Sequence, residues 1–145
     1  MPELPEVETV TRLIRPGVEG QRIRGVEVSW ERTLGGLSVG EFEREVLGKS
    51  ITRAWRRAKY IVLDLAQGKR GAGSLLVHLR MTGRLQMVDA REEPDKFERL
   101  RLVFPRQRAL AFLDVRKFGR FCFESEPEAV LGRLGPEPLE SEFTR

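Results

Sequence analysis

The sequence predicts an α+β fold in which a mainly antiparallel, two-layer β-sandwich carries flanking α-helices. One observation is the helical spacing of apolar residues in two segments before residue 50. The other is a change of pattern after residue 50, where short runs of Val, Ile, Leu and Phe alternate with turns that contain Gly or Pro. Because these turns are too short to hold crossover helices, antiparallel hairpins are favoured over parallel strands.

Two helices and one strand are expected before residue 50. Apolar residues at spacings of three and four predict a first helix that ends at Pro16-Gly17. A strand is expected over residues 23–30. Ser38 and Glu41 form a capping-box pattern, in which each side chain accepts a hydrogen bond from the backbone N–H of the other residue. This pattern predicts the start of a second, short helix.

Seven short strands are expected after residue 50, each rich in leucine, β-branched or aromatic side chains. Turn-forming residues separate them, for example from Gly68 to Gly73. A last short helix is expected over residues 128–134. The expected strands cover residues 51–55, 60–65, 75–79, 85–88, 100–104, 109–113 and 121–123.

The composition is typical of one globular domain, since 145 residues with 40% hydrophobic and 33% charged side chains can bury a core. No apolar run approaches the roughly 18 residues of a membrane span, and no signal-peptide pattern is present, so a cytoplasmic location is expected. One cysteine, Cys122, and one histidine, His78, cannot make an internal disulfide or a multi-cysteine zinc site. We expect Cys122 to be a small core residue and His78 a hydrogen-bonded structural one.

Basic residues are concentrated in two segments of the chain. Residues 49–73 hold seven lysines and arginines against the single acid Asp64, and residues 99–120 hold another seven against Asp114. Residues 121–145 are acidic, with six glutamates against two arginines. Aromatic residues lie within both basic segments, which favours the phosphate backbone of a nucleic acid as partner over a merely solvated face.

The first residues carry a candidate catalytic group. A proline at position 2 permits removal of the initiator methionine, which leaves Pro2 as a secondary amine at the chain terminus. Such an amine can attack an electrophilic sugar or carbonyl carbon and form an iminium, a Schiff-base route that needs no cofactor. A helix N-terminus beside an amine disfavours its charged form, and a neighbouring carboxyl such as Glu3 can act as a general acid. Glu6 shares this neighbourhood.

Five segments carry a resemblance to a known family. The opening residues 2–9, with the letters PELPEVET, resemble the start of the formamidopyrimidine-DNA glycosylases, which are base-excision repair enzymes for oxidised purines. Four further segments agree with that family in the same order, so that the resemblance extends over residues 2–139. These segments are RRAKY (residues 56–60), HLRMTG (78–83), DVRKFG (114–119) and LGPEPL (134–139).

The resemblance implies roles for four residues in catalysis. The Pro2 amine attacks C1′ of the damaged nucleotide while Glu3 protonates the oxygen of the sugar ring, and the base leaves. The resulting Schiff base leads to strand cleavage by β- and δ-elimination. Glu6 matches a carboxylate of the same pocket and is expected to support proton transfer. Lys59 matches a lysine that contacts phosphate beside the lesion, and we expect it on a strand.

The resemblance also implies how the enzyme fills the gap that an extruded nucleotide leaves in the base stack. Met81 and Phe118 match side chains that wedge between bases, and Arg116 matches one that hydrogen-bonds the orphaned partner base. Flanking glycines place both apolar residues on loops. Arg57 and Lys117 complete the expected DNA-binding residues, although Lys117 replaces the family's usual arginine and loses bidentate geometry. Similarly, Arg80 replaces the family's usual glycine.

The same resemblance sets expectations for domains and partners. Residues 1–134 are expected to form the N-terminal catalytic sandwich domain, and residues 135–145 a linker or tail. Family members continue into a helix-two-turn-helix domain and a zinc finger that this sequence lacks, so no cofactor is expected in this chain. The expected partner is double-stranded DNA with oxidised bases or abasic sites. The chain is expected to be a monomer without membrane contact, and weak or inactive by itself because phosphate contacts are missing.

Three alternatives remain open. The chain can be a non-catalytic DNA-binding domain that kept the fold. It can also be an endonuclease VIII-like glycosylase for oxidised pyrimidines, which shares the chemistry of Pro2 and Glu3, although Leu4 and Val7 resemble the purine branch more. The third alternative is an N-terminal-proline tautomerase for small keto acids, which leaves the basic segments unexplained.

Overall fold

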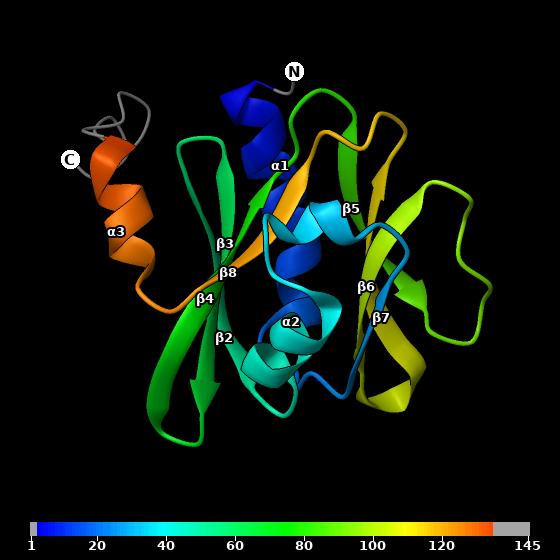
Figure 1. The fold of residues 1–145 in the computed structure, drawn as a ribbon, viewed down its shortest axis with the longest axis horizontal. Helices are drawn as coiled ribbons and strands as arrows, with labels where there is room; N and C mark the ends of the chain where they lie inside the picture. Colours follow the sequence, from blue (N-terminus) through cyan, green and yellow to red (C-terminus); the bar gives the residue numbers. More distant parts are fainter. Residues whose placement is uncertain (1–2, 135–145) are drawn as a thin grey trace.

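The computed structural model describes residues 3–134, which form two β-sheets packed face to face with helices around them (Figure 1). Within this range eight strands form two four-stranded antiparallel sheets, which confirms the predicted α+β sandwich. The first sheet has the order β2-β3-β4-β8 and the second the order β1-β6-β7-β5. The strands are Gly25–Val28 (β1), Ser50–Arg57 (β2), Tyr60–Gln67 (β3), Arg70–His78 (β4), Gly83–Asp89 (β5), Glu98–Phe104 (β6), Arg108–Asp114 (β7) and Arg120–Glu124 (β8).

The helices also follow the sequence pattern, with small shifts at their ends. The capping box is confirmed, since the Glu41 N–H donates to Ser38 Oγ at 3.1 Å and the Ser38 N–H donates to a Glu41 carboxylate oxygen at 2.9 Å. The expected helix over residues 128–134 is divided into an α-helical and a 3₁₀ part. The α-helices are Leu4–Val18 (α1), Val39–Val46 (α2) and Pro127–Leu131 (α3), and the 3₁₀ helices are Glu31–Leu34 (η1), Pro105–Gln107 (η2) and Gly132–Leu134 (η3).

Several boundaries differ from the prediction, and three of these differences have a structural reason or consequence. Helix α1 continues through Pro16-Gly17 to Val18, because a proline in the last turn removes only one helical hydrogen bond and Val18 is fully buried. Strand β1 covers residues 25–28 in place of 23–30, and Trp30 leads directly into η1. The turn between β3 and β4 is shorter than expected, since pairing already resumes between Gln67 and Arg70.

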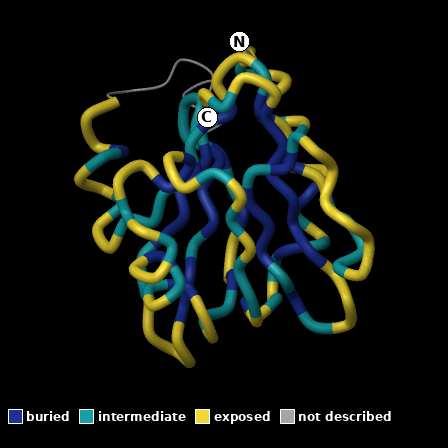
Figure 2. Tube along the Cα trace, turned by 45° about the vertical axis from the view of Figure 1, so that its right-hand side comes forward, coloured by how far each residue is buried: buried dark blue, intermediate teal, exposed yellow. Residues whose placement is uncertain are grey.

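The two sheets enclose an apolar core that the helices close at the sides. The buried trace runs along the strands in the interior, and exposed residues collect in the loops at both ends (Figure 2). Phe42 of α2 packs edge-on against Phe121 of β8, and Phe121 in turn contacts Phe112 of β7, so that α2 and both sheets share one aromatic cluster. Such contacts between layers fix how the sheets face each other.

Helix α1 lies along the edge strands β2 and β5, one from each sheet. The backbone of Gly17 comes so close to Met87 of β5 that a Cβ atom at this position would lie 2.8 Å from the Met87 Cγ. At the edge of β2, the backbone N–H of Ala54 donates to Glu19 at 2.9 Å, and the Ala54 carbonyl accepts from Arg15 Nε at 3.0 Å. Side chains of the helix therefore satisfy backbone groups that an edge strand leaves without a strand partner.

Two arginines of the basic segments are buried in ion pairs, so these segments are not wholly solvated surfaces. The Arg56 side chain is 4% exposed, and its Nε donates to Glu8 of α1 at 2.9 Å. The Arg101 guanidinium donates to both carboxylate oxygens of Glu98, at 2.7 and 2.9 Å. This pairing raises the pKa of Arg101. Both arginines hold elements together and are unavailable to a partner.

Helix α3 packs on the outer face of the first sheet. Leu131 is buried there together with Val62 and Leu76, and Trp55 borders the cluster. The predicted division between a domain over residues 1–134 and a tail over residues 135–145 stays a prediction, because the tail lies outside the described residues.

We expect that Glu8→Gln lowers the free energy of unfolding by about 2 kcal/mol, because it weakens a charge-assisted hydrogen bond to the buried Arg56. Arg12 is the matched control, since it binds the same Glu8 carboxylate but is 67% exposed. Arg12→Gln is expected to cost less than about 0.5 kcal/mol. Urea unfolding of the three proteins measures both values, and equal losses would contradict this assignment.

Candidate functional site

The predicted site residues gather at one end of the sandwich. The start of α1, the β2–β3 turn, the β4–β5 loop and the β7–β8 loop all reach the upper end in the view of Figure 1. These segments carry Glu3, Lys59, Met81 and Phe118, in chain order. Pro2 lies outside the described residues, directly before the first of these segments. The fold thus brings together residues that are up to 115 positions apart, from 3 to 118.

Glu3 and Glu6 lie at the N-terminal end of α1. Glu3 is the N-cap residue, and its backbone N–H donates to a Glu6 carboxylate oxygen at 3.2 Å. Both residues are exposed, so their carboxylates are open to a bound molecule. The Glu6 carboxylate complements the helix N-terminus and fixes the direction in which the chain enters the helix.

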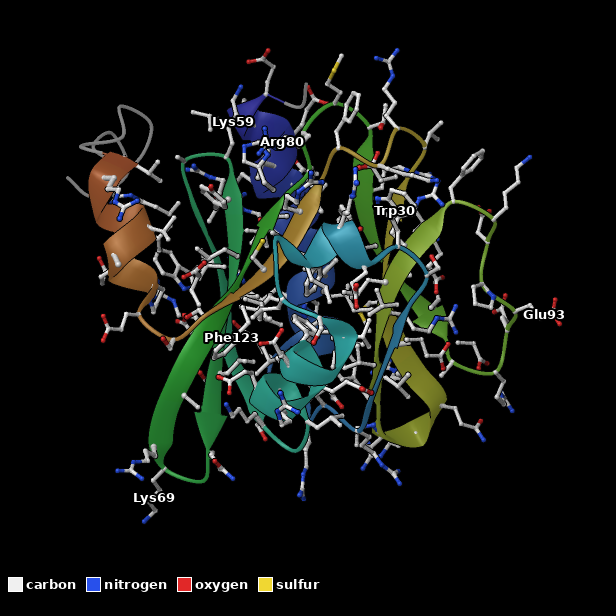
Figure 3. All side chains as sticks on the ribbon, in the orientation of Figure 1. Trp30, Lys59, Lys69, Arg80, Glu93 and Phe123 are labelled. Carbon is white, nitrogen blue, oxygen red and sulfur yellow. The ribbon has the colours of Figure 1, made fainter. Side chains whose placement is uncertain are left out.

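Lys59 lies at the tip of the β2–β3 hairpin and not on a strand, which corrects the prediction. Strand pairing ends at Arg57 and Tyr60, so that Ala58 and Lys59 form a two-residue turn. Ala58 adopts the left-handed conformation at φ 53°, which glycine or asparagine usually takes, so no sequence signal marks this connection as a two-residue turn. Figure 3 shows Lys59 beside the N-terminal end of α1.

The buried Arg56 connects this turn to the helix. Its Nε donates to Glu8 of α1, and its Nη1 donates to the Ala58 carbonyl at 2.8 Å. One guanidinium therefore holds both the N-terminal helix and the backbone next to Lys59. Arg57, the last residue of β2, is half-buried and lies next to this anchor in the sequence.

Met81 and Phe118 are exposed apolar residues on loops, as the sequence predicted. Met81 is 50% exposed in the β4–β5 loop, and Phe118 is 49% exposed in the β7–β8 loop. Arg116 shares the second loop and approaches the first, since its Nη1 lies 4.0 Å from the Met81 Sδ. Apolar side chains this exposed are typical of a contact surface.

Asp114 joins the two loops, and the sequence reasoning gave it no role. It is the last residue of β7 and is 1% exposed. One carboxylate oxygen accepts from the Thr82 hydroxyl and from the Arg116 N–H at 3.2 Å, and the other accepts from the Gly119 N–H at 2.6 Å. Burial of a carboxylate beside exposed loops is a structural signal that the sequence pattern does not contain.

Two glycines allow the loops to approach the sheets closely. A Cβ atom on Gly83 would collide with the backbone of Leu79. A Cβ atom on Gly119 would collide with the Phe112 ring and would lie 2.9 Å from the Asp114 carboxylate. Both positions therefore require glycine for reasons of space.

Lys117 points away from the loop tip and onto Trp30. Its Nζ lies 4.0 Å from the centre of the Trp30 ring, which is a cation–π contact. The backbone of Lys117 is left-handed at φ 61°. The neighbouring Arg120 donates to the carbonyls of Lys117, Phe118 and Gly119 at 2.9 to 3.2 Å. The cation expected to bind DNA at position 117 is thus engaged in holding its own loop.

The family model of the formamidopyrimidine-DNA glycosylase N-terminal domain matches residues 1–121. The chain belongs to this family. Relatives named formamidopyrimidine-DNA glycosylase from Carboxydothermus hydrogenoformans and Protochlamydia amoebophila are 43% and 40% identical over 145 residues. Each match covers 99% of this chain and 51% of the relative. The chain therefore spans about half the length of the curated relatives it matches.

Solved structures of the family have the same fold. A Lactococcus lactis formamidopyrimidine-DNA glycosylase bound non-covalently to DNA with an AP site is 31% identical, with a TM-score of 0.83 over 94% of this chain and 52% of that one. The Lactococcus lactis glycosylase in complex with DNA containing FAPY-dG is 30% identical, with a TM-score of 0.80 over 91% of this chain and 48% of that one.

Arg80, at the position where the resemblance implies that glycine is usual, has a left-handed backbone with φ 57°. This conformation costs an L-residue about 1–2 kcal/mol, and glycine adopts it freely. The Arg80 N–H donates to His78 Nδ1 at 3.1 Å, and Figure 3 shows Arg80 near Lys59 at the site. The substitution therefore adds a cation at the cost of backbone strain.

His78 and Cys122 flank the site on neighbouring strands. His78 packs edge-on against Tyr60, with ring centres 5.2 Å apart, and accepts the Arg80 N–H, as expected of a structural histidine. Burial lowers its pKa, and the charges of Arg80 and Lys59 lower it further. Cys122 is half-buried and not a core residue, and burial raises the pKa of its thiol.

No metal site or membrane span is found in the described part of the chain. Within residues 3–134, His, Cys, Asp and Glu side chains do not gather in groups of three that could hold a metal ion. No helix in this range is long and apolar enough to cross a membrane.

We expect Arg80→Gly to raise the free energy of unfolding by about 0.5–1 kcal/mol, because relief of left-handed strain exceeds the entropic cost of glycine. Lys117→Gly is the comparison, since it relieves the same strain but loses the contact with Trp30. Its net effect is expected to be near zero. Denaturant unfolding measures both, and a loss of stability in Arg80→Gly contradicts the strain argument.

We expect NMR titration to find the pKa of His78 below its ordinary value of 6.5. The unfolded chain then binds the proton more readily, so His78 costs no stability well above pH 6.5 and destabilises the fold as the pH falls from there through the folded pKa. Arg80→Gly is expected to raise the pKa of His78, because a nearby positive charge is removed. Arg84→Gln removes an exposed arginine elsewhere and is expected to leave it unchanged.

Proposed function

We propose that this chain carries the catalytic chemistry of a DNA glycosylase with AP lyase activity in base-excision repair. The observation that supports this proposal is the placement of the N-terminal Glu3 and the exposed Met81, Phe118 and Arg116 at one end of a sandwich of the glycosylase family. In the sequence, Pro2 directly precedes Glu3. The buried Arg56 keeps the helix and the Lys59 turn fixed there.

The proposed reaction begins at the amine of Pro2 after removal of Met1. The lone pair of the amine forms a bond to C1′ of the damaged nucleotide, and the bond from C1′ to the base breaks with its electron pair on the base. The departing base takes up the proton that the amine loses. Glu3 protonates the oxygen of the sugar ring, which opens the ring and gives the Schiff base. Loss of the 3′ and then the 5′ phosphate by β- and δ-elimination cleaves the strand. Glu6 supports proton transfer, and Lys59 binds a phosphate beside the lesion.

DNA recognition is proposed to depend on extrusion of the damaged nucleotide. Unstacking a base costs a few kcal/mol, which side chains that enter the vacated space offset. Met81 and Phe118 are the apolar wedges, and Arg116 hydrogen-bonds the orphaned partner base. Arg57 is proposed to contribute positive charge along the DNA backbone. Lys117 is proposed to add positive charge to the DNA-facing loop, and its ammonium group lies over the Trp30 ring.

The proposed substrates are oxidised purines and abasic sites in double-stranded DNA. Structures of Lactococcus lactis relatives hold DNA with an AP site and with FAPY-dG, which supports this class. Another holds DNA with an oxidized pyrimidine, so a pyrimidine lesion belongs in the same assay. Because lysines and arginines that contact phosphates displace counterions, DNA binding is expected to depend strongly on salt.

Borohydride reduction of the Schiff base tests the proposal directly. Protein without Met1, incubated at low salt with duplex DNA containing an abasic site, is expected to form a covalent adduct. Pro2→Gly is expected to reduce the adduct strongly. Glu3→Gln is expected to reduce the excision of 8-oxoguanine more than the capture of an abasic site. The reason is that an abasic site has already lost its base, so no base has to leave.

Two results would contradict the proposal. Adducts that form equally well with protein that retains Met1, in which the Pro2 nitrogen is an amide, exclude the Pro2 amine as the nucleophile. Salt-sensitive DNA binding without any covalent capture assigns the chain to a non-catalytic DNA-binding role.

A further inference from the structure

We infer that Asp114 and Thr82 are positioning residues that lock the two wedge-bearing loops into a single unit. This inference rests on the proposed function, because it concerns how Met81, Arg116 and Phe118 enter the base stack. Asp114 is 1% exposed, and Thr82 lies half-buried between the loops.

The hydrogen bonds of Asp114 reach both loops at once. One carboxylate oxygen accepts from the hydroxyl of Thr82, the residue after Met81 in the β4–β5 loop. The same oxygen accepts from the Arg116 N–H. The other oxygen accepts from the N–H of Gly119, the residue after Phe118. The residues that precede or follow each wedge are therefore tied to one rigid point at the end of β7.

Thr82 adds a second bond between the loops. The Arg116 N–H, which donates to Asp114, also donates to the Thr82 hydroxyl oxygen at 3.3 Å. The hydroxyl thus donates to the carboxylate and accepts from the partner loop, so it uses both of its hydrogen-bonding functions. Side chains of the two loops also contact each other, since the Arg116 Nη1 lies 4.0 Å from the Met81 Sδ.

The donors that the described residues provide to this carboxylate are neutral: one hydroxyl and two backbone N–H groups. Among the described residues, no arginine or lysine forms an ion pair with this carboxylate, so its task is to accept hydrogen bonds from opposite sides. An asparagine has almost the same shape but offers one acceptor oxygen and one NH₂ group. In Asp114→Asn, the NH₂ group faces a backbone N–H of the β7–β8 loop, either that of Arg116 or that of Gly119, so the hold on this loop is weakened.

Locking the loops matters for the energy of nucleotide extrusion. Base stacking on an inserted aromatic side chain is worth about 1–3 kcal/mol, but ordering a free loop consumes a comparable amount. If Met81, Arg116 and Phe118 are already held in position, the loops lose their conformational entropy during folding and not during DNA binding. Loss of the lock therefore lowers activity on stacked duplex DNA and leaves activity on unstacked single strands unchanged.

The test compares Thr82→Val, which keeps the shape and removes the hydroxyl, with Thr82→Ser, which keeps the hydroxyl. Thr52→Val is the matched control, since Thr52 is exposed and its hydroxyl donates to the Asp64 carbonyl within the first sheet. Each protein, without Met1, is assayed by borohydride capture on an abasic site in single-stranded and in duplex DNA. Thr82→Val and Asp114→Asn are expected to lose about tenfold in the rate of duplex capture, the effect of one or two hydrogen bonds.

Single-strand capture is expected to stay within about twofold of the wild type for every variant, and Thr82→Ser is expected to restore the duplex rate. Equal losses on both DNA forms overturn the inference, because they indicate general damage to the fold. An unchanged duplex rate in both Thr82→Val and Asp114→Asn overturns it as well.

A readout without chemistry separates this inference from the proposed function. Duplex DNA with 2-aminopurine next to an abasic site changes its fluorescence when a side chain enters the stack. If the wild-type protein forms no adduct with single-stranded DNA, the proposed chemistry fails, and the fluorescence change still tests the lock. Thr82→Val is expected to reduce this change at saturating protein, and a change equal to that of the wild type overturns the inference.

Discussion

The placement of the functional end depends on one buried guanidinium. Arg56 binds Glu8 of α1 on one side and the Ala58 carbonyl of the β2–β3 turn on the other. Because its side chain is 4% exposed, the charge has little access to water and the two contacts must be kept. The N-terminal helix and the turn that carries Lys59 therefore move as one body with the edge of the first sheet.

Backbone strain is concentrated at the same end of the molecule. Among the non-glycine residues that the structure describes with a positive φ, Ala58, Arg80 and Lys117 lie in the turn and loops of the site. Such conformations persist only where the surroundings hold them, and here the surroundings are Arg56, His78, Trp30 and Asp114. The loops of the site are therefore held in place by residues of the sandwich and of the segments next to it.

The sequence alone predicted the sandwich, both capped helices and the exposure of Met81 and Phe118, because these follow from local periodicity and from the resemblance. It did not predict contacts between distant residues, such as the one from Glu8 to Arg56 over 48 positions or from Thr82 to Asp114 over 32. Arg56 and Arg101 counted as surface charge in the sequence and are buried in the fold. The expected strands left residues 56–59 as a connection, but the tight turn of Ala58 and Lys59 was not predicted, because alanine is not a usual left-handed residue.

The way α1 covers β2 has a consequence for solubility. The helix and the segment after it occupy the outer N–H and carbonyl groups of Ala54 and Ile51, which would otherwise be open for pairing with a strand of another molecule. Displacement of the helix would expose an apolar strand edge able to recruit further copies into intermolecular sheets. The element that presents the N-terminus to DNA is thus the same one that protects the protein from self-association.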